Sequence, residues 1–230
     1  MQPSPHGYTN DTTGDGVVVV KRYTGPDSEA RRELERGVLT RLQGLLPVPP
    51  VLNRRESGSA PDDLELTLRF VHGAHGQDLL DAGRAAGVLN ASGRILARIH
   101  GLDATGILPG RPVKAGDVLV HGDFGPNNLL LDPESLQVVA VLDWEWAHVG
   151  RPIEDLAWCE WIVRMHHPDH VAALDELFAG YGARPAWPER HAAMMVGCRQ
   201  LIDFCERWEP GGDGVRQWRD RASVTASWLE

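Results

Sequence analysis

Three short apolar runs divide the middle of the chain. Valine, leucine and alanine fill residues 118–120, 129–131 and 138–142, and turn-forming polar residues, glycine or proline separate one run from the next. Runs of this length between turn-forming residues predict buried β-strands. The polar residues that follow each run therefore lie on loops at strand ends, where a rigid scaffold can direct them into one cleft.

Two further strands and one helix are predicted nearer the N-terminus. Residues 17–20 are four consecutive valines followed by Lys21, and residues 64–71 alternate leucine or phenylalanine with other residues. Both patterns are typical of strands, in which successive side chains point to opposite faces. Residues 28–43 begin after a Gly-Pro-Asp turn, end before Gly44 and carry leucine or valine at positions 34, 38 and 42. This spacing predicts an amphipathic helix.

Helical patterns fill most of the remaining chain. Tryptophan, leucine and methionine recur there at the spacing of a core-facing helix stripe. A small group of strands followed by many helices predicts an α+β fold. Helices are expected at residues 77–86, 91–102, 150–165, 168–180, 188–208 and 213–229, with Asn90 as the cap of the second.

The loop after the first apolar run combines groups suited to phosphoryl transfer. His121, Asp123 and Asn128 form the pattern H-x-D-x-x-x-x-N, and Asp143 ends the third run. Magnesium prefers oxygen ligands, so Asn128 and Asp143 can hold the metal while Asp123 receives the proton of a substrate hydroxyl. Each of these residues alone could simply form a turn. The complete set in this order favours kinase chemistry.

The segment HGDFGPNN, followed by VLDWEWAHVGRPIEDLAW, resembles the signature of the aminoglycoside phosphotransferase-like family of small-molecule kinases. The resemblance is strongest over residues 120–158. It implies that Asp123 is the catalytic base and that Asn128, in the same catalytic loop, binds Mg²⁺ together with Asp143. It also implies that Asp155 braces the catalytic loop.

The same resemblance implies a bilobal, protein-kinase-like α+β fold. A small N-lobe of antiparallel strands with one helix is expected at residues 1–71, and a hinge at residues 72–76. A mostly helical C-lobe, carrying the catalytic loop and the acceptor pocket, is expected at residues 77–230.

ATP is the nucleotide that the resemblance implies, held mainly by the N-lobe. Lys21 and Glu35 match the family's ion pair, in which the glutamate fixes the lysine on the nucleotide phosphates. Residues 6–10 stand where the family has its phosphate-covering loop, although Gly7 is the only glycine there. The expected nucleotide contacts are Lys21, Glu35, Val19, Asn10 and, through the backbone at the adenine edge, Phe70 and Val71.

The acceptor is expected to be a small molecule that carries a hydroxyl group. Acids accumulate in the half of the chain that should hold its pocket, and the net charge of the chain is −9. An acidic pocket attracts cations, so we expect a positively charged acceptor such as a cationic antibiotic or an amine-bearing metabolite. The alternative is that the acids are only solvated. The acids expected at the acceptor are Glu145, Glu160, Asp203 and Glu206.

Composition narrows the class of protein further. The chain has 230 residues, of which 42% are hydrophobic, enough for a core of one large domain or two small lobes. No apolar run is long enough for a membrane span, and the N-terminus has no apolar signal region, so we expect a cytoplasmic protein. Three cysteines far apart in sequence agree with reduced thiols. The negative charge argues against a nucleic-acid partner.

Two other functions remain open on the sequence alone. A metal-dependent phosphoester hydrolase could use His121, Asp123, Asp143 and His148 as ligands, but it leaves Lys21 and the other kinase-like residues unexplained. A kinase-like scaffold that binds nucleotide without turnover would fit the short N-terminal region.

Overall fold

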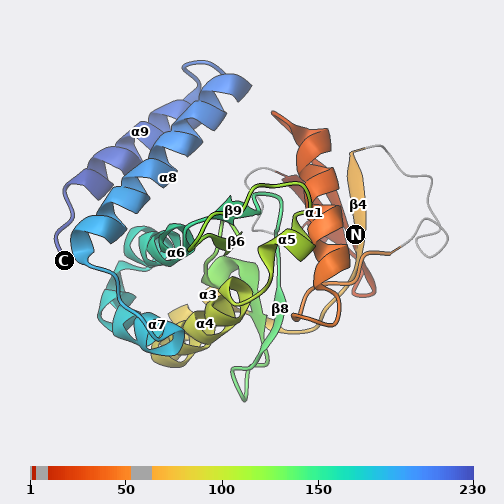
Figure 1. The fold of residues 1–230 in the computed structure, drawn as a ribbon, viewed down its shortest axis with the longest axis horizontal. Coiled ribbons are helices and arrows are strands. Elements are labelled where there is room, and N and C mark those ends of the chain that lie inside the picture. The colour runs from red at the N-terminus through yellow and green to blue at the C-terminus, as the bar shows by residue number, and fades with distance from the viewer. Residues whose placement is uncertain (1, 4–9, 53–63) are drawn as a thin grey trace.

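The computed structural model describes residues 2–3, 10–52 and 64–230 and confirms the bilobal α+β fold. In the small lobe the antiparallel sheet has the order β1-β2-β3-β4, with helix α1 packed against it (Figure 1). The elements of this lobe are β1 (Gln2–Pro3), β2 (Asn10–Gly14), β3 (Val18–Tyr23), α1 (Ser28–Leu42) and β4 (Glu65–Arg69).

Strand β3 brings Lys21 to the inner face of this sheet. Lys21 lies opposite Thr12 on β2 and Leu66 on β4, and its side chain is buried. Helix α1 buries Val38 and Leu42 beneath the sheet, as their spacing predicted. The lysine therefore sits between the sheet and the helix, in reach of side chains on α1.

The large lobe is mostly helical, with two small antiparallel sheets of order β5-β7-β8 and β6-β9. Its first half contains β5 (Ala74–His75), α3 (Gly76–Leu79), the π-helical turn η1 (Leu80–Arg84), α4 (Ala85–His100), α5 (Ala104–Ile107) and β6 (Val118–Val120). The 3₁₀ turn η2 (Pro126–Asn128), β7 (Leu129–Leu131), β8 (Val138–Val141) and β9 (His148–Gly150) follow. The last elements are α6 (Pro152–His166), η3 (Pro168–Ala173), α7 (Leu174–Tyr181), α8 (Trp187–Trp208) and α9 (Asp213–Ala226).

The prediction of Asn90 as a helix cap is wrong. Helix α4 already begins at Ala85, so Asn90 lies inside it, where its side chain donates a 3.0 Å hydrogen bond to Glu176. The break falls earlier, at Gly83, whose φ of 84° interrupts the helical backbone. A glycine adopts this left-handed conformation without strain, which is why the helix is interrupted there.

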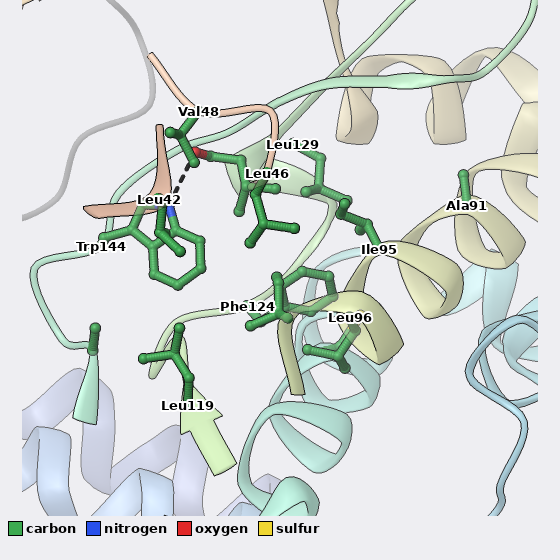
Figure 2. Packing of buried hydrophobic residues seen from close by; sticks show 14 of the residues in the cluster. Leu42, Leu46, Val48, Ala91, Ile95, Leu96, Leu119, Phe124, Leu129 and Trp144 are labelled. Carbon is green, nitrogen blue, oxygen red and sulfur yellow. Dashed lines mark hydrogen bonds between the residues drawn. The ribbon is translucent and has the colours of Figure 1, made fainter. Parts of the chain in front are cut away.

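Two hydrophobic clusters form the core, of which the main one spans both lobes. The main cluster joins α1, α4, the central strands and α7, and Figure 2 shows part of it. The second cluster joins α6 to the α8–α9 hairpin and consists mostly of tryptophan, methionine and alanine side chains. The side chains labelled in Figure 2 are Leu42, Leu46, Val48, Ala91, Ile95, Leu96, Leu119, Phe124, Leu129 and Trp144.

Three further expectations concern the chain as a whole. The expected phosphate-covering loop, apart from Asn10, lies outside the described residues, as do residues 53–63. Across residues 2–3, 10–52 and 64–230, no helix has the length and apolarity needed to cross a bilayer. Cys159, Cys198 and Cys205 are free thiols, as their spacing indicated.

Candidate active site

A buried aspartate on α6 holds the catalytic loop in place. Asp155 accepts hydrogen bonds from the backbone N–H groups of His121 and Gly122, at 2.8 and 2.9 Å, and from the imidazole of His100 at 3.1 Å. Burial disfavours its charge, but the hydrogen bond and charge of His100 and the backbone donor hold its pKa below the usual range. Gly122 has φ of 87°, and a Cβ there would lie 2.4 Å from the carbonyl oxygen of Trp146. The sharp turn therefore requires glycine.

His121 is neutral and fully engaged by the backbone. Its Nδ1 accepts from the N–H of Asp123 at 3.2 Å, so Nε2 carries the proton and donates to the carbonyl of Leu142 at 2.8 Å. Burial lowers its pKa, despite the nearby charges of Asp155 and Asp143. A metal ligand needs a free ring nitrogen, and His121 has none. The hydrolase alternative therefore loses its first ligand.

Asp123 is held by one donor on each carboxylate oxygen. Oδ1 accepts from the indole Nε1 of Trp158 at 2.8 Å, and Oδ2 accepts from Nδ2 of Asn128 at 2.9 Å. Burial, and next the negative charge of Asp143, raise the pKa of Asp123 to about 7, while the two donors act in the opposite direction. The carboxylate is thus both fixed in orientation and a stronger base than an exposed aspartate.

Asn128 and Asp143 line the same cleft as Asp123. Nδ2 of Asn128 donates to the carboxylate and to the backbone oxygen of Asp123, so Oδ1 is the Asn128 side-chain atom that could bind a cation. Asp143 follows β8 with φ of 64°, a conformation that L-residues adopt rarely and that is common at functional sites. An amide oxygen and a carboxylate are hard oxygen donors, so this pair fits Mg²⁺.

Lys21 bridges the two lobes. Its Nζ lies 2.7 Å from Oε2 of Glu35 on α1 and also contacts Oδ1 of Asp143. Burial works against its charge, but the carboxylates of Asp143, Glu35 and Glu145 together hold the pKa of Lys21 above its usual value. The predicted Lys21–Glu35 pair is thus formed. Glu35 also accepts from Tyr23 and from the backbone N–H of Trp144.

Glu145 lies in a buried polar network, and the contacts of its carboxylate do not fit a role at the acceptor. Its Oε2 is 2.7 Å from Nη1 of Arg31 on α1, and its Oε1 accepts from Nδ2 of Asn10 at 2.8 Å. Arg31 also donates to the carbonyls of Thr24 and Pro26. This network joins the small lobe to the segment after Asp143. The amide nitrogen of Asn10 is accordingly directed at Glu145.

Beside these residues the large lobe has a cleft of about 1390 Å³, which is where the acceptor was expected. Asp203 lines it, whereas Glu160 and Glu206 do not. Glu160 is only 1% exposed and binds Arg190 and Arg164, so its carboxylate is not available to a ligand, and Glu206 pairs with Arg219 at 2.8 Å away from the cleft lining. Besides the catalytic loop, the cleft is lined by Trp146, Ile153, Trp158, Val196, Leu201 and Trp208.

The predicted adenine contacts lie where the chain passes between the lobes. Val19 is partly buried in β3 opposite Leu68. Phe70 donates its backbone N–H to the carbonyl of Val17 at 2.9 Å, and Phe70 and Val71 are half-buried. Their contact with a nucleotide stays a prediction, as do the residue limits of the hinge.

Two contacts of this site involve residues that the sequence did not single out. Trp158 binds Asp123 although the family signature, which ends at this residue, gave it no role, and Arg31 binds Glu145 across 114 positions of sequence. For Trp158 a signal existed: it lies one helical turn after Asp155, on the face of α6 that meets the catalytic loop.

Comparisons with known proteins agree with this geometry. The family model of the phosphotransferase enzyme family matches residues 2–117 and 107–193. Acyl-CoA dehydrogenase family member 11 of Homo sapiens is 49% identical over 39 residues, which is 17% of this chain and only 5% of that protein.

Solved structures share the fold at low sequence identity. The GDP complex of aminoglycoside 2′-phosphotransferase-IIIa has a TM-score of 0.73 and 13% identity, covering 97% of this chain and 91% of that one. Aminoglycoside phosphotransferase APH(3″)-Id from Streptomyces rimosus, in complex with ADP and streptomycin, has a TM-score of 0.64 and 18% identity, covering 84% and 90%. The chain therefore belongs to the phosphotransferase enzyme family and has the fold of aminoglycoside phosphotransferases.

Proposed function

We propose that the protein transfers the γ-phosphoryl group of ATP, with Mg²⁺, to a hydroxyl group of a small molecule. The observation that carries this proposal is the convergence of Asp123, Asn128 and Asp143 on one cleft, with Lys21 and Glu35 paired beside Asp143. These are the parts that the phosphoryl-transfer template requires: a carboxylate for the nucleophile, oxygen ligands for a metal and a lysine for the phosphates.

Asp123 orients the acceptor hydroxyl and receives its proton. Each carboxylate oxygen keeps a free lone pair beside its protein donor, so the hydroxyl can donate to either one. The raised pKa of Asp123, about 7, brings the basicity of its carboxylate closer to that of the acceptor oxygen. This favours transfer of the hydroxyl proton to Asp123 late in a loose transition state.

Lys21 neutralises charge that gathers on the phosphates during transfer. Its ammonium group remains charged because three carboxylates surround it, and Glu35 fixes its position. A magnesium ion held by Asn128 and Asp143 would supply further positive charge to the phosphate oxygens. Because Lys21 contacts Asp143, its ammonium group would lie next to both the magnesium ion and the phosphates.

The acceptor enters from the side of the cleft formed by α6 and α8. Asp203 is the acid from the predicted set that lines this side, so a positive charge on the acceptor would lie near α8. The aromatic lining, with Trp146 and Trp208, suits a compound with apolar surface next to its hydroxyl group.

The test is a screen with ATP and Mg²⁺ against compounds of the kinds bound or used by proteins of similar fold. The panel contains streptomycin, kanamycin, gentamicin, a macrolide and choline, each with product mass as readout. Aryl-alkyl alcohols such as tryptophol extend it toward apolar acceptors. We expect a mass increase of one phosphate and equal release of ADP.

Two outcomes would refute the proposal. ATP binding without turnover across the panel would favour the scaffold that only binds nucleotide. Phosphate release from phosphoesters without added nucleotide would favour the hydrolase.

A further inference from the structure

The indole of Trp158 contacts the reactive carboxylate directly. Trp158 lies on α6, three residues after Asp155, and its Nε1 donates to Oδ1 of Asp123 at 2.8 Å. The side chain is almost fully buried, with 8% of the residue exposed where it borders the cleft. A buried hydrogen bond of this length to a charged acceptor is among the stronger ones in proteins.

Trp158 cannot move away from Asp123, because the α8–α9 hairpin packs against its other side. Its ring stacks on Trp161 with centroids 4.5 Å apart and planes inclined by 3°, and Trp218 of α9 continues the stack. On α8, a Cβ at Gly197 would lie 2.7 Å from the Trp158 ring, so helix and ring touch without intervening space. In Figure 1 the hairpin extends from the large lobe as the last part of the chain.

We propose that Trp158 is a positioning residue for Asp123, and that the α8–α9 hairpin acts on the reaction through it. This inference rests on the role of Asp123 in the proposed function. Asn128 alone restrains only Oδ2, and a single hydrogen bond, which tolerates a range of distances and angles, limits the terminal torsion of the carboxylate only loosely. The indole of Trp158 fixes the second oxygen, so the plane of the Asp123 carboxylate has one orientation toward the acceptor hydroxyl.

The first test observes the contact without turnover. The chain contains eight tryptophans, and ¹⁵N-tryptophan labelling gives one indole N–H resonance for each. The resonance lost in Trp158→Phe identifies Trp158, and that lost in Trp161→Phe identifies Trp161, whose N–H donates to Thr225 at 2.8 Å. In Asp123→Ala we expect the Trp158 resonance to shift and its hydrogen exchange to accelerate at least tenfold, with Trp161 unchanged. A Trp158 resonance indifferent to Asp123→Ala overturns the inference.

The second test separates positioning from structural support. With ATP and the panel compound that is phosphorylated fastest, Trp158→Phe keeps a ring in the stack but lowers kcat about tenfold, with the KM for ATP unchanged. Trp161→Phe removes a matched buried indole hydrogen bond in the same stack and leaves kcat within about twofold. Equal losses in both variants would show that the stack only supports the fold.

The third test acts from the hairpin. Gly197→Ala pushes a methyl group into the Trp158 ring, so kcat falls while the KM for ATP stays constant. Gly37→Ala is the matched control in another helix, since a Cβ there meets only the flexible end of Arg41 at 3.0 Å. Unchanged kcat in Gly197→Ala would overturn the role of the hairpin. If wild-type protein phosphorylates no panel compound, the proposed function fails, whereas the resonance of Trp158 still decides whether it is held by Asp123.

Discussion

Asp155→Ala should destabilise the fold strongly, because it leaves two backbone N–H groups of the catalytic loop, one buried and one partly buried, without an acceptor. Hydrogen bonds to a charged acceptor contribute about 1.5 kcal/mol or more each, and the bond from His100 adds about 1 kcal/mol. We therefore expect the free energy of unfolding to fall by about 4 kcal/mol. For a chain of this size that corresponds to a decrease in Tm of roughly 8–16 °C.

The assay combines urea denaturation with amide hydrogen exchange. Exchange at His121 and Gly122 should accelerate more than at the centre of α4, because their acceptor is removed. Asp155→Asn should fall between wild type and Asp155→Ala, since an amide offers one oxygen where the carboxylate offers two. The control is Glu154→Ala on the same helix, where a half-exposed carboxylate pairs with His148 and the loss should stay near 1 kcal/mol.

The pH dependence of this effect follows from the sign of the pKa shift. The pKa of Asp155 is lower in the folded protein than its usual 3.8, so the unfolded chain binds more protons near that pH. The stabilisation by Asp155 is therefore complete well above pH 4 and disappears as the pH falls through the folded pKa. A difference below 1 kcal/mol between wild type and Asp155→Ala at pH 7 would refute the assignment of Asp155 as the brace of the loop.

The remaining predictions concern the reaction. Asp123→Ala should abolish phosphoryl transfer while ATP affinity stays within a few-fold, and turnover at the wild-type rate would exclude Asp123 as the base. Asp143→Ala should weaken Mg·ATP binding, and Asn128→Ala should weaken it less, since only Asp143 is charged. Nucleotide titrations with and without Mg²⁺ measure both effects. Mg²⁺ dependence that survives both changes would place the metal ligands elsewhere. Lys21→Ala should raise the KM for ATP or lower kcat more than Glu35→Ala does. The double variant should be little worse than Lys21→Ala, and fully additive losses would show that the two do not act as a pair.

Sequence patterns predicted the parts of the fold that depend on neighbouring residues. The end of α1 before Gly44 and the three central strands follow from local spacing, and all are present. Strand β9 was not predicted, because its pairing with β6 depends on a partner some 30 positions away. The error at Asn90 has a local cause, since Gly83 displaces the start of α4 and no pattern distinguishes a capping asparagine from one inside a helix.

The candidate site also contains residues that the sequence could predict and residues that depend on contacts distant in sequence. Lys21, Glu35 and Asp123 were found because a family signature fixes their order along the chain, and the structure brings Lys21 and Glu35 together. The acids chosen for the acceptor were selected by charge alone. Glu145 pairs with Arg31 and Glu160 with Arg190, arginines more than 25 positions away that only the fold brings near, and Glu160 pairs as well with Arg164 on its own helix.

The buried pair between Arg31 and Glu145 ties the position of Glu35 to the large lobe. It attaches α1, the helix that carries Glu35, to the segment that follows Asp143. Removing one member of such a pair leaves the other as an unpaired buried charge, at a cost of roughly 3–5 kcal/mol. The placement of Glu35 beside Lys21 in the small lobe therefore depends on a residue of the large lobe that lies two positions after Asp143.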